Sequence, residues 1–316
     1  MRLHLPRVLV GTIAALALTG CTGGGTPAAS GPATPTTSQP TTSVPTASAA
    51  PVDQDRVDRA LAALEQRYDA TVGVVATDTG TGATVSYRAD RRFGYASTIK
   101  VLAAAAFLRS VPVAERSAVV HWTAADVAAA GYSPVTEQHV ADGLPSDEVA
   151  EAAVRMSDNT ALNVLLDRIG GPAALDAALA DLGDTTTEVV HGEPDLNTIE
   201  PGSTEDTTTP AAFAAVLARV LDGRTLGRAD TALLTDWMSG NATGDALVRA
   251  GAPDGRVVAD KSGGAGPIRN DVARVTRPDG DPVVIAVLTT RNDPDEPYDD
   301  ALVAESARVA LAALDH

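Results

Sequence analysis

The chain has 316 residues, 44% of them hydrophobic and 21% charged, which is enough for one large or two modest globular domains. Its 41 acidic residues against 24 lysines and arginines give a net charge of −17, which argues against nucleic acid or an anionic membrane surface as a partner. It has one cysteine, Cys21, no paired histidines and no nucleotide-binding loop, so it cannot form an internal disulfide, and we expect no metal and no cofactor.

Residues 1–21 are predicted to form an export signal, because arginines precede an apolar run, Val8 to Leu18, that is too short to span a membrane. The segment ends in Leu-Thr-Gly-Cys, which resembles a bacterial lipobox and implies cleavage before Cys21 and acylation of its sulfur. Plain secretion after cleavage near Ala17 is the alternative. We therefore expect an exported protein, either secreted or held on the outer face of the cell membrane only by a lipid on Cys21.

Residues 22–52 are rich in Thr, Pro, Ser and Ala and carry no charge, a composition typical of a linker. The folded domain is expected at residues 53–316. Its first element is predicted to be a helix over residues 53–68, because apolar residues recur there at helical spacing.

Two strands, 71–78 and 83–90, flank a Thr-Gly-Thr-Gly turn and predict a β-hairpin. A buried helix should follow from Ser97 to about Leu108, since its run of alanines favours close packing on all sides. Residues 110–240 are largely helical in pattern and are interrupted by loops. The long irregular stretch 184–209 is typical of a functional loop.

The chain returns to strands at 255–263, 268–276 and 282–290, and then ends in a helix over about 298–314. This order of elements predicts an α+β fold. Its first part is a five-stranded antiparallel sheet with both terminal helices on one face.

The predicted fold therefore has two lobes. Residues 53–92 and 241–316 form the lobe that contains the sheet. Residues 93–240 form an all-α lobe inserted between them.

The chain contains only two lysines, Lys100 and Lys261, and the other 22 of its 24 lysines and arginines are arginine. Arginine cannot lose its proton in a protein, whereas a buried lysine can, so these positions suggest a need for a removable proton. Ser97 and Lys100 are three residues apart near the start of a helix and share one face, which suits a nucleophile and its base. Taken alone, the pair also fits a surface lysine near a helix start.

Three further stretches carry polar groups. Ser157-Asp158-Asn159 opens a predicted helix and also suits a helix cap. Lys261-Ser262-Gly263 ends a strand and also suits a polar turn. Glu193-Pro194-Asp195-Leu196-Asn197 lies in the long loop.

The motifs Ser-x-x-Lys, Ser-Asp-Asn and Lys-Ser-Gly, in this order, resemble those of the penicillin-recognising serine enzymes. The Glu-Pro-Asp-Leu-Asn loop and the separations between the motifs are similar to those of class A serine β-lactamases, here as an actinobacterial-type lipoprotein. The resemblance covers the chain from about Asp53 to its end. It implies a two-lobed β-lactamase/transpeptidase-like fold, hydrolysis of the β-lactam amide of penicillins or cephalosporins, a small-molecule substrate and a monomer.

The resemblance also implies the catalytic roles. Ser97 is the nucleophile, and either Lys100 or Glu193 is the base that activates it. Ser157 passes a proton to the departing ring nitrogen, and the backbone N–H groups of Ser97 and Gly264 form the oxyanion hole. Glu193 then activates the water that cleaves the acyl-enzyme.

The residues that the resemblance assigns to substrate binding come from all the motifs. Asn159 would hold the acylamide side chain of the substrate, and Asn197 would help Glu193 to position the water. The full set is Tyr132, Asn159, Asn197, Lys261, Ser262, Gly263 and Arg269. Of these, Lys261, Ser262 and Arg269 would receive the substrate carboxylate.

The loop differs from that of many class A enzymes at its neck, where His191 replaces an arginine that pairs with an aspartate, here Asp206. An ion pair between the two requires a protonated imidazole, normally below about pH 6.5. Gly192 replaces a larger residue and adds backbone freedom. We therefore expect a more mobile loop and slower deacylation than in an arginine-paired relative.

Two other functions fit part of this pattern. A cell-wall D-alanyl-D-alanine peptidase or transpeptidase uses the same nucleophile, but that class lacks the deacylation pair Glu193 and Asn197. A non-catalytic lipoprotein that binds wall fragments is the third reading, which the intact Ser97, Lys100 and Lys261 argue against.

Overall fold

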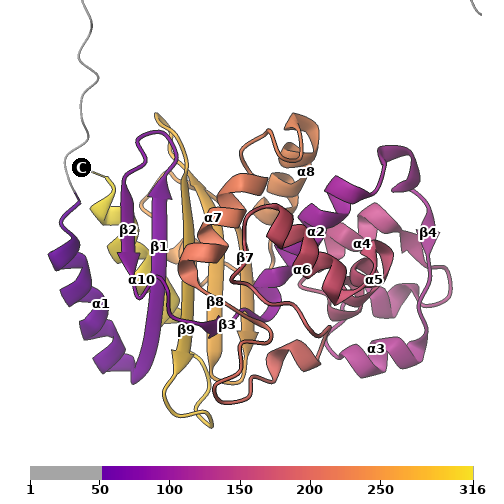
Figure 1. Ribbon diagram of the computed structural model, residues 1–316, viewed down its shortest axis with the longest axis horizontal. Helices are drawn as coiled ribbons and strands as arrows, with labels where there is room; N and C mark the ends of the chain where they lie inside the picture. Colours follow the sequence, from indigo (N-terminus) through magenta and orange to yellow (C-terminus); the bar gives the residue numbers. More distant parts are fainter. Residues whose placement is uncertain (1–51, 316) are drawn as a thin grey trace, which may run out of the picture. The chain divides into compact units, whose positions relative to one another are not determined.

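A five-stranded antiparallel sheet forms one lobe of the computed structural model, which describes residues 52–315 (Figure 1). The strand order is β2-β1-β9-β8-β7, as the chain pairs its N-terminal hairpin with its last strand. The strands are β1 (Ala70–Asp78), β2 (Thr84–Tyr87), β7 (Val257–Ala265), β8 (Ile268–Thr276) and β9 (Val283–Arg291). The predicted sheet and the α+β fold class are thus confirmed.

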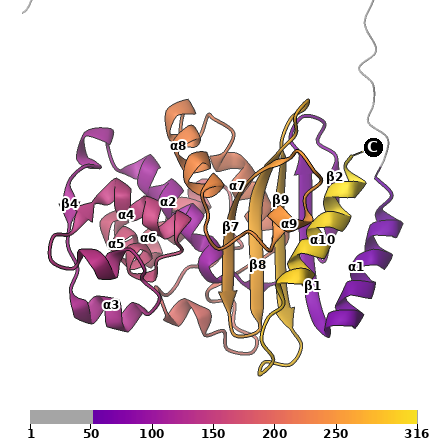
Figure 2. The same ribbon diagram turned by 180° about the vertical axis from the view of Figure 1, so that it is seen from behind.

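The two terminal helices, α1 (Gln54–Tyr68) and α10 (Asp300–Ala313), cover one face of this sheet (Figure 2). Asp53 caps α1, since its side chain accepts a hydrogen bond from the Arg56 backbone N–H. Apolar residues of both helices pack on the sheet and form one of the two hydrophobic clusters. The short helix α9 (Val248–Gly251) lies beside α10.

The opposite face of the sheet carries α7 (Pro210–Val220), which packs on β1 and β9. This helix falls within the range 93–240 that we predicted as an all-α lobe. The lobe therefore contacts the sheet directly, and the second hydrophobic cluster runs through both.

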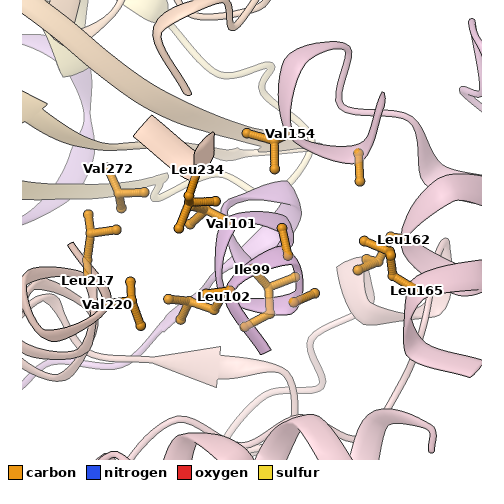
Figure 3. Close-up of a cluster of buried hydrophobic side chains, with 14 of the residues drawn as sticks. Ile99, Val101, Leu102, Val154, Leu162, Leu165, Leu217, Val220, Leu234 and Val272 are labelled. Atoms are coloured by element: carbon orange, nitrogen blue, oxygen red, sulfur yellow. The ribbon is translucent and has the colours of Figure 1, made fainter. Parts of the chain in front are cut away.

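The helices of the other lobe surround α2, the buried helix that follows Ser97 (Figure 3). The helices of this lobe are α2 (Ile99–Ser110), α3 (Ala124–Ala130), α4 (Ser146–Arg155), α5 (Asn159–Ile169), α6 (Pro172–Asp181) and α8 (Arg228–Ser239). Of these, α4, α5, α6 and α8 pack on α2, and α3 packs on α5. Residues on every side of α2 are buried, because its alanines let neighbouring helices approach closely. α2 begins two residues after Ser97, which itself lies on a 3₁₀ turn, η1 (Ala96–Thr98).

Several short elements were not predicted, because two- to four-residue segments carry no periodic signal. Two small sheets pair β3 (Phe93–Gly94) with β6 (Thr207–Thr208) and β4 (Val119–Val120) with β5 (Leu144–Pro145). Further 3₁₀ turns are η2 (Val113–Glu115), η3 (Thr136–His139) and η4 (Asp195–Asn197). The first small sheet ties the end of the long loop to the segment before Ser97.

The predicted export signal, the lipidation site Cys21 and all of the predicted linker except Val52 lie outside the described residues. Within residues 52–315, no helix combines the length and apolar character that crossing a membrane would require.

Candidate active site

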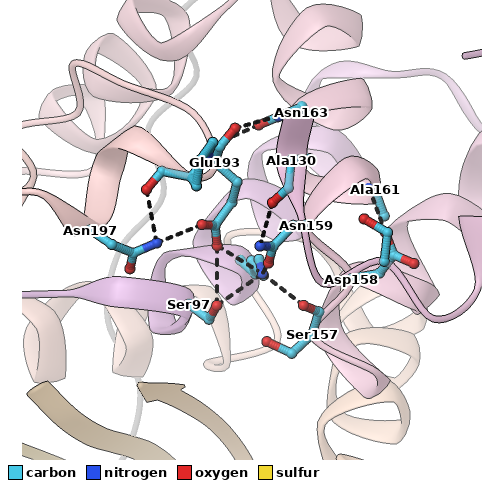
Figure 4. A network of polar contacts seen from close by, with 12 residues as sticks. Ser97, Ala130, Ser157, Asp158, Asn159, Ala161, Asn163, Glu193 and Asn197 are labelled. Carbon is cyan, nitrogen blue, oxygen red and sulfur yellow. Dashed lines mark hydrogen bonds and ion pairs between the residues drawn. The ribbon is translucent and has the colours of Figure 1, made fainter. Parts of the chain in front are cut away.

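Ser97 lies within hydrogen-bond distance of both residues that the sequence suggested as its base, Lys100 and Glu193. Figure 4 shows the contact between Ser97 and Glu193. Its Oγ is 2.9 Å from Lys100 Nζ and 3.2 Å from Glu193 Oε1. The preceding residue, Ala96, has a φ of 48°, a left-handed conformation that alanine rarely adopts. Such backbone strain persists only where the surrounding fold fixes the conformation. The turn around Ser97 is therefore held in one arrangement.

The amine of Lys100 is fully buried and has four oxygen neighbours. The Ser157 carbonyl at 2.8 Å and Asn159 Oδ1 at 2.6 Å can only accept hydrogen bonds, so the amine donates one N–H to each of them. One position on the nitrogen remains, and Ser97 Oγ and Glu193 Oε1 both lie 2.9 Å away. When the amine is charged, a third N–H occupies this position. When the amine is neutral, a lone pair occupies it and can accept the proton of the Ser97 hydroxyl.

Both lysines have lowered pKa values, as a base in this position requires. Burial lowers the pKa of Lys100, and the carboxylates of Glu193 and Asp158 oppose that effect. Burial, followed by the charge of Lys100, lowers the pKa of Lys261 to about 7, against the pull of Asp260 and other carboxylates. The charge of Lys100 is thus the second cause, after burial, of the lowered pKa of Lys261.

Ser157 connects the two lysines. Its Oγ accepts a hydrogen bond from Lys261 Nζ at 3.0 Å, and its carbonyl accepts from Lys100 Nζ at 2.8 Å. Its φ of 56° is again in the left-handed region, a cost that the fixed surroundings offset. Because the Ser157 oxygen already accepts from Lys261, its own proton is available to another group.

The start of α5 is capped by Asp158 rather than by Ser157. Asp158 Oδ1 accepts from the Ala161 backbone N–H and from the Thr136 hydroxyl, both at 2.8 Å. The Asn159 backbone N–H donates to the Tyr132 carbonyl at 2.8 Å, although Tyr132 as a residue is 56% exposed. The buried cap thus fixes the orientation in which Asn159 meets Lys100.

Glu193 is held from two directions. Asn163, on α5, binds both backbone polar groups of Glu193, with its Oδ1 2.8 Å from the N–H and its Nδ2 2.8 Å from the carbonyl. Asn197 Nδ2 donates to Glu193 Oε2 at 2.7 Å, which leaves Oε1 for Ser97 and Lys100. A Cβ on Gly192 would lie 2.6 Å from Asn163 Oδ1. The glycine that we expected to add freedom therefore also lets the loop lie close against α5.

Gly263 on β7 brings the sheet against the turn that carries Ser97. A Cβ there would lie 2.9 Å from both Thr98 N and Tyr95 O and 3.1 Å from Ser97 N, so no larger residue fits without displacement. Asn270, opposite Gly263 on β8, donates to the Tyr95 carbonyl at 3.1 Å. The Gly263–Gly264 edge of β7 is thereby held beside the backbone of Ser97.

The residues assigned to a substrate carboxylate come from neighbouring strands. Ser262 on β7 is almost fully buried, and its Oγ lies 2.6 Å from Thr243 Oγ1. Arg269 on β8 stands opposite Gly264, donates from Nε to Asp300 Oδ1 at 2.6 Å, and stacks on the Tyr298 ring. The guanidinium of Arg269 is thus held beside Gly264 of the edge strand β7.

The neck of the loop is organised by the buried Asp206. Its Oδ1 accepts from Tyr95 Oη at 2.6 Å and from the backbone N–H groups of Val190 and His191 at 3.0 and 3.1 Å. Its Oδ2 lies 2.5 Å from His191 Nδ1, which raises the pKa of the imidazole. Burial raises the pKa of Asp206, but the hydrogen bonds from Tyr95 and His191 outweigh it and the net shift is downward.

Sequence reasoning missed several residues that support the site. Asn163 lies in the middle of a helical pattern, and Thr243 lies in a loop, so neither has a motif that would single it out. Asp158 lies inside the Ser-Asp-Asn motif and Asp260 directly precedes the Lys-Ser-Gly motif, and only the burial of these two carboxylates reveals their role.

The arrangement combines a hydroxyl nucleophile, two candidate bases and two buried lysines. Within residues 52–315, no cluster of three or more His, Cys, Asp or Glu side chains could hold a metal ion. Nucleophilic attack followed by proton transfer between these side chains is the chemistry that the described groups support.

Comparisons with known proteins all point to one family. A family model described as "Beta-lactamase enzyme family" matches residues 56–314. A β-lactamase of Bacillus amyloliquefaciens is 49% identical over 249 residues, covering 78% of this chain and 81% of its own length. One of Amycolatopsis lactamdurans is 45% identical over 267 residues, covering 84% and 88%.

Solved structures give the same result. The class A β-lactamase of Clostridium kluyveri superposes with a TM-score of 0.79 at 42% identity, covering 82% of this chain and 98% of that one. The β-lactamase of Streptosporangium roseum superposes with a TM-score of 0.80 at 38% identity, with the same coverage of 82% and 98%.

Proposed function

The chain belongs to the β-lactamase enzyme family and has the class A fold, and from this premise we propose that it hydrolyses penicillins and cephalosporins through an acyl-enzyme on Ser97 that Glu193 helps water to cleave. The observation that carries the proposal is the contact of Ser97 Oγ with both Lys100 and Glu193. One side chain can activate the hydroxyl, and Glu193 is within reach to activate the water.

In acylation, the Ser97 oxygen attacks the carbonyl carbon of the β-lactam ring and its proton passes to Lys100 or to Glu193. The lowered pKa of Lys100 supports the first route, and the 3.2 Å contact with Glu193 Oε1 supports the second. The negative charge that forms on the carbonyl oxygen is stabilised by the backbone N–H groups of Ser97 and Gly264. Losing one such donor typically slows a reaction by about 10²–10³.

The carbon–nitrogen bond of the ring then breaks, and the nitrogen takes a proton from Ser157. This role is supported by the hydrogen bond that Ser157 Oγ accepts from Lys261, because it leaves the Ser157 proton free to be donated. Lys261, with a pKa lowered to about 7, can return a proton to Ser157.

In deacylation, Glu193 removes a proton from water, whose oxygen attacks the acyl carbon. The bond between that carbon and the Ser97 oxygen then breaks, and the oxygen takes the proton back from Glu193, whose Oε1 lies 3.2 Å from it. Asn197 Oδ1 is buried and has no hydrogen-bond partner among residues 52–315, although its Nδ2 donates to Glu193. Such an acceptor suits the second proton of that water.

The charge state of His191 should modulate this second step. Its pKa is raised by Asp206, so the ion pair is fully present below about pH 6.5 and fades as pH rises through the raised value. At the acid end the pair is lost as pH falls through the lowered pKa of Asp206. A neutral imidazole protonated on Nδ1 still donates to Asp206, and three other donors remain, so we expect less than about a tenfold effect.

The test compares the deacylation rate of the parent with that of His191→Arg at about pH 5.5 and at about pH 8.5. The two proteins should be similar at the lower pH, and the parent should be slower at the higher. A ratio that does not change with pH would contradict a role for the imidazole charge.

The carboxylate of the substrate is assigned to Lys261, Ser262 and Arg269. Their positions on the paired strands β7 and β8, together with the planar guanidinium of Arg269, support this assignment. The acylamide side chain is assigned to Asn159, and Tyr132 is assigned to substrate binding because its backbone carbonyl holds the Asn159 backbone N–H.

We also propose that the protein acts outside the cell as a monomer and reaches the membrane only through a lipid on Cys21. The Leu-Thr-Gly-Cys ending of the signal and the uncharged linker support an anchored domain. The mass of the mature N-terminal peptide, with or without an acylated cysteine, decides between anchoring and plain secretion.

The proposal is tested with the full chain and a chromogenic cephalosporin. We expect a burst of product close to one per enzyme, then steady turnover, and a transient adduct that mass spectrometry of quenched samples locates on the peptide with Ser97. A stable adduct without turnover would favour the peptidase class, and neither burst nor adduct would favour a non-catalytic protein.

A further inference from the structure

A chain of hydrogen bonds leads from Ser262 away from the substrate side, through residues that none of the motifs contains. Ser262 Oγ lies 2.6 Å from Thr243 Oγ1, and Thr243 Oγ1 lies 2.8 Å from Asn241 Oδ1. Asn241 Nδ2 lies 2.5 Å from Asp260 Oδ2, and Asp260 is also paired with Arg249. Asn241, Asp260 and Ser262 are almost fully buried.

The direction of every proton in this chain can be deduced. The Thr243 backbone N–H can only donate and lies 3.2 Å from Asn241 Oδ1, so that atom is the amide oxygen. The Asn241 amino group then faces the Asp260 carboxylate, as the 2.5 Å contact requires. Because the amide oxygen accepts, the Thr243 hydroxyl must donate to it. Thr243 has only one hydroxyl proton, so the proton between Thr243 and Ser262 belongs to Ser262.

The surrounding fold fixes this chain of hydrogen bonds at both ends. A Cβ on Gly244 would lie 1.7 Å from Asp260 Oδ2 and 2.6 Å from Asn241 Nδ2, so a glycine is required beside their contact. The pairing of Asp260 with Arg249 fixes the far end. The orientation of Asn241, and with it the proton of Thr243, is therefore set by groups remote from the substrate.

From this geometry we infer that Thr243 is a specificity-determining residue. In the free enzyme its hydroxyl oxygen accepts a hydrogen bond from the Ser262 hydroxyl, and it so competes with the substrate carboxylate for that hydrogen bond. The inference rests on the proposed function, which assigns Ser262 to the carboxylate. A carboxylate can only accept, so Ser262 must turn its proton from Thr243 to the substrate when a β-lactam binds. Thr243 thereby weakens the recognition of carboxylate-bearing substrates.

Thr243→Val removes the competing acceptor with little change in shape. We expect kcat/KM for a cephalosporin with a free carboxylate to rise by about two- to tenfold, the value of one neutral hydrogen bond between hydroxyls. The kcat value should change little, because the carboxylate contact is made equally in the bound and acyl states. The methyl ester of the same cephalosporin should show no change in kcat/KM.

Two controls separate this effect from a general disturbance. Thr243→Ser keeps the hydroxyl and should behave as the parent does. In a Ser262→Ala background, Thr243→Val should have no effect, because the proton in question is gone. Thermal unfolding of each variant shows whether it is folded, and Thr243→Ala replaces Thr243→Val if the latter is not.

The inference is overturned if acid and ester change by the same factor, if kcat/KM for the acid falls, or if the effect persists in the Ser262→Ala background. Failure of the proposed function looks different, since the parent protein would then turn over neither substrate.

Discussion

The Glu193→Gln variant should react once with a cephalosporin and then stop. The substitution keeps the shape of the side chain and a carbonyl oxygen for Asn197, but it removes the base that the proposed deacylation needs. Removing a general base typically costs about 10²–10⁴ in rate. Acylation should persist, because the loss of the Glu193 charge removes an interaction that raises the pKa of Lys100. Lys100 would then be deprotonated more readily and could still activate Ser97.

The measurement is the fraction of enzyme carrying the adduct, followed by mass spectrometry from milliseconds to hours. We expect nearly complete and lasting occupancy in Glu193→Gln, whereas the adduct of the parent should disappear once the substrate is consumed. Ser97→Ala is the matched control and should carry no adduct at any time. Turnover by Glu193→Gln at the rate of the parent would exclude Glu193 as the deacylation base.

The elements that could be predicted from the sequence are those with a long periodic pattern. The hairpin, the three last strands and the terminal helices were all found within a few residues of their bounds. Each helix has apolar residues at helical spacing, and each strand is a short run rich in apolar residues that turn residues delimit. The 3₁₀ turn at Ser97 was not, since it depends on the strained backbone of Ala96 and on the approach of Gly263, which lies far away in the chain.

The site divides in a similar way. Ser97 and Lys100 could be singled out by their spacing and by the rarity of lysine in this chain, and Ser157 by the resemblance of its motif to that of a known family. Asn163 and Thr243 act by contact alone, and contacts between distant segments leave no local pattern in one sequence. The same holds for the neck, where the sequence suggested only the His191–Asp206 pair and the additional donors to Asp206 emerged from the packing of the loop.

Lys100→Met should have the complementary effect and slow acylation. Methionine is similar in length to lysine, but it has no proton to exchange with Ser97, so the rate of adduct formation should fall by about 10²–10⁴. The substitution also leaves the hydrogen-bond and ion-pair partners of the amine without a donor. The carbonyl oxygens of Ser157 and Asn159 lose a buried donor, and Glu193 loses its buried counter-charge.

The loss of stability must be separated from the loss of the base. Breaking a buried ion pair on one side typically costs about 3–5 kcal/mol, so Lys100→Met should unfold at a clearly lower temperature. Adding Glu193→Gln removes the unpaired charge, and the double variant should recover part of that loss while still acylating slowly. Stopped-flow acylation rates for the parent and the three variants then identify the base. If Lys100→Met acylates as fast as the parent while Glu193→Gln is slow, Glu193 and not Lys100 activates Ser97, and the lowered pKa of Lys100 serves only to tune its neighbours.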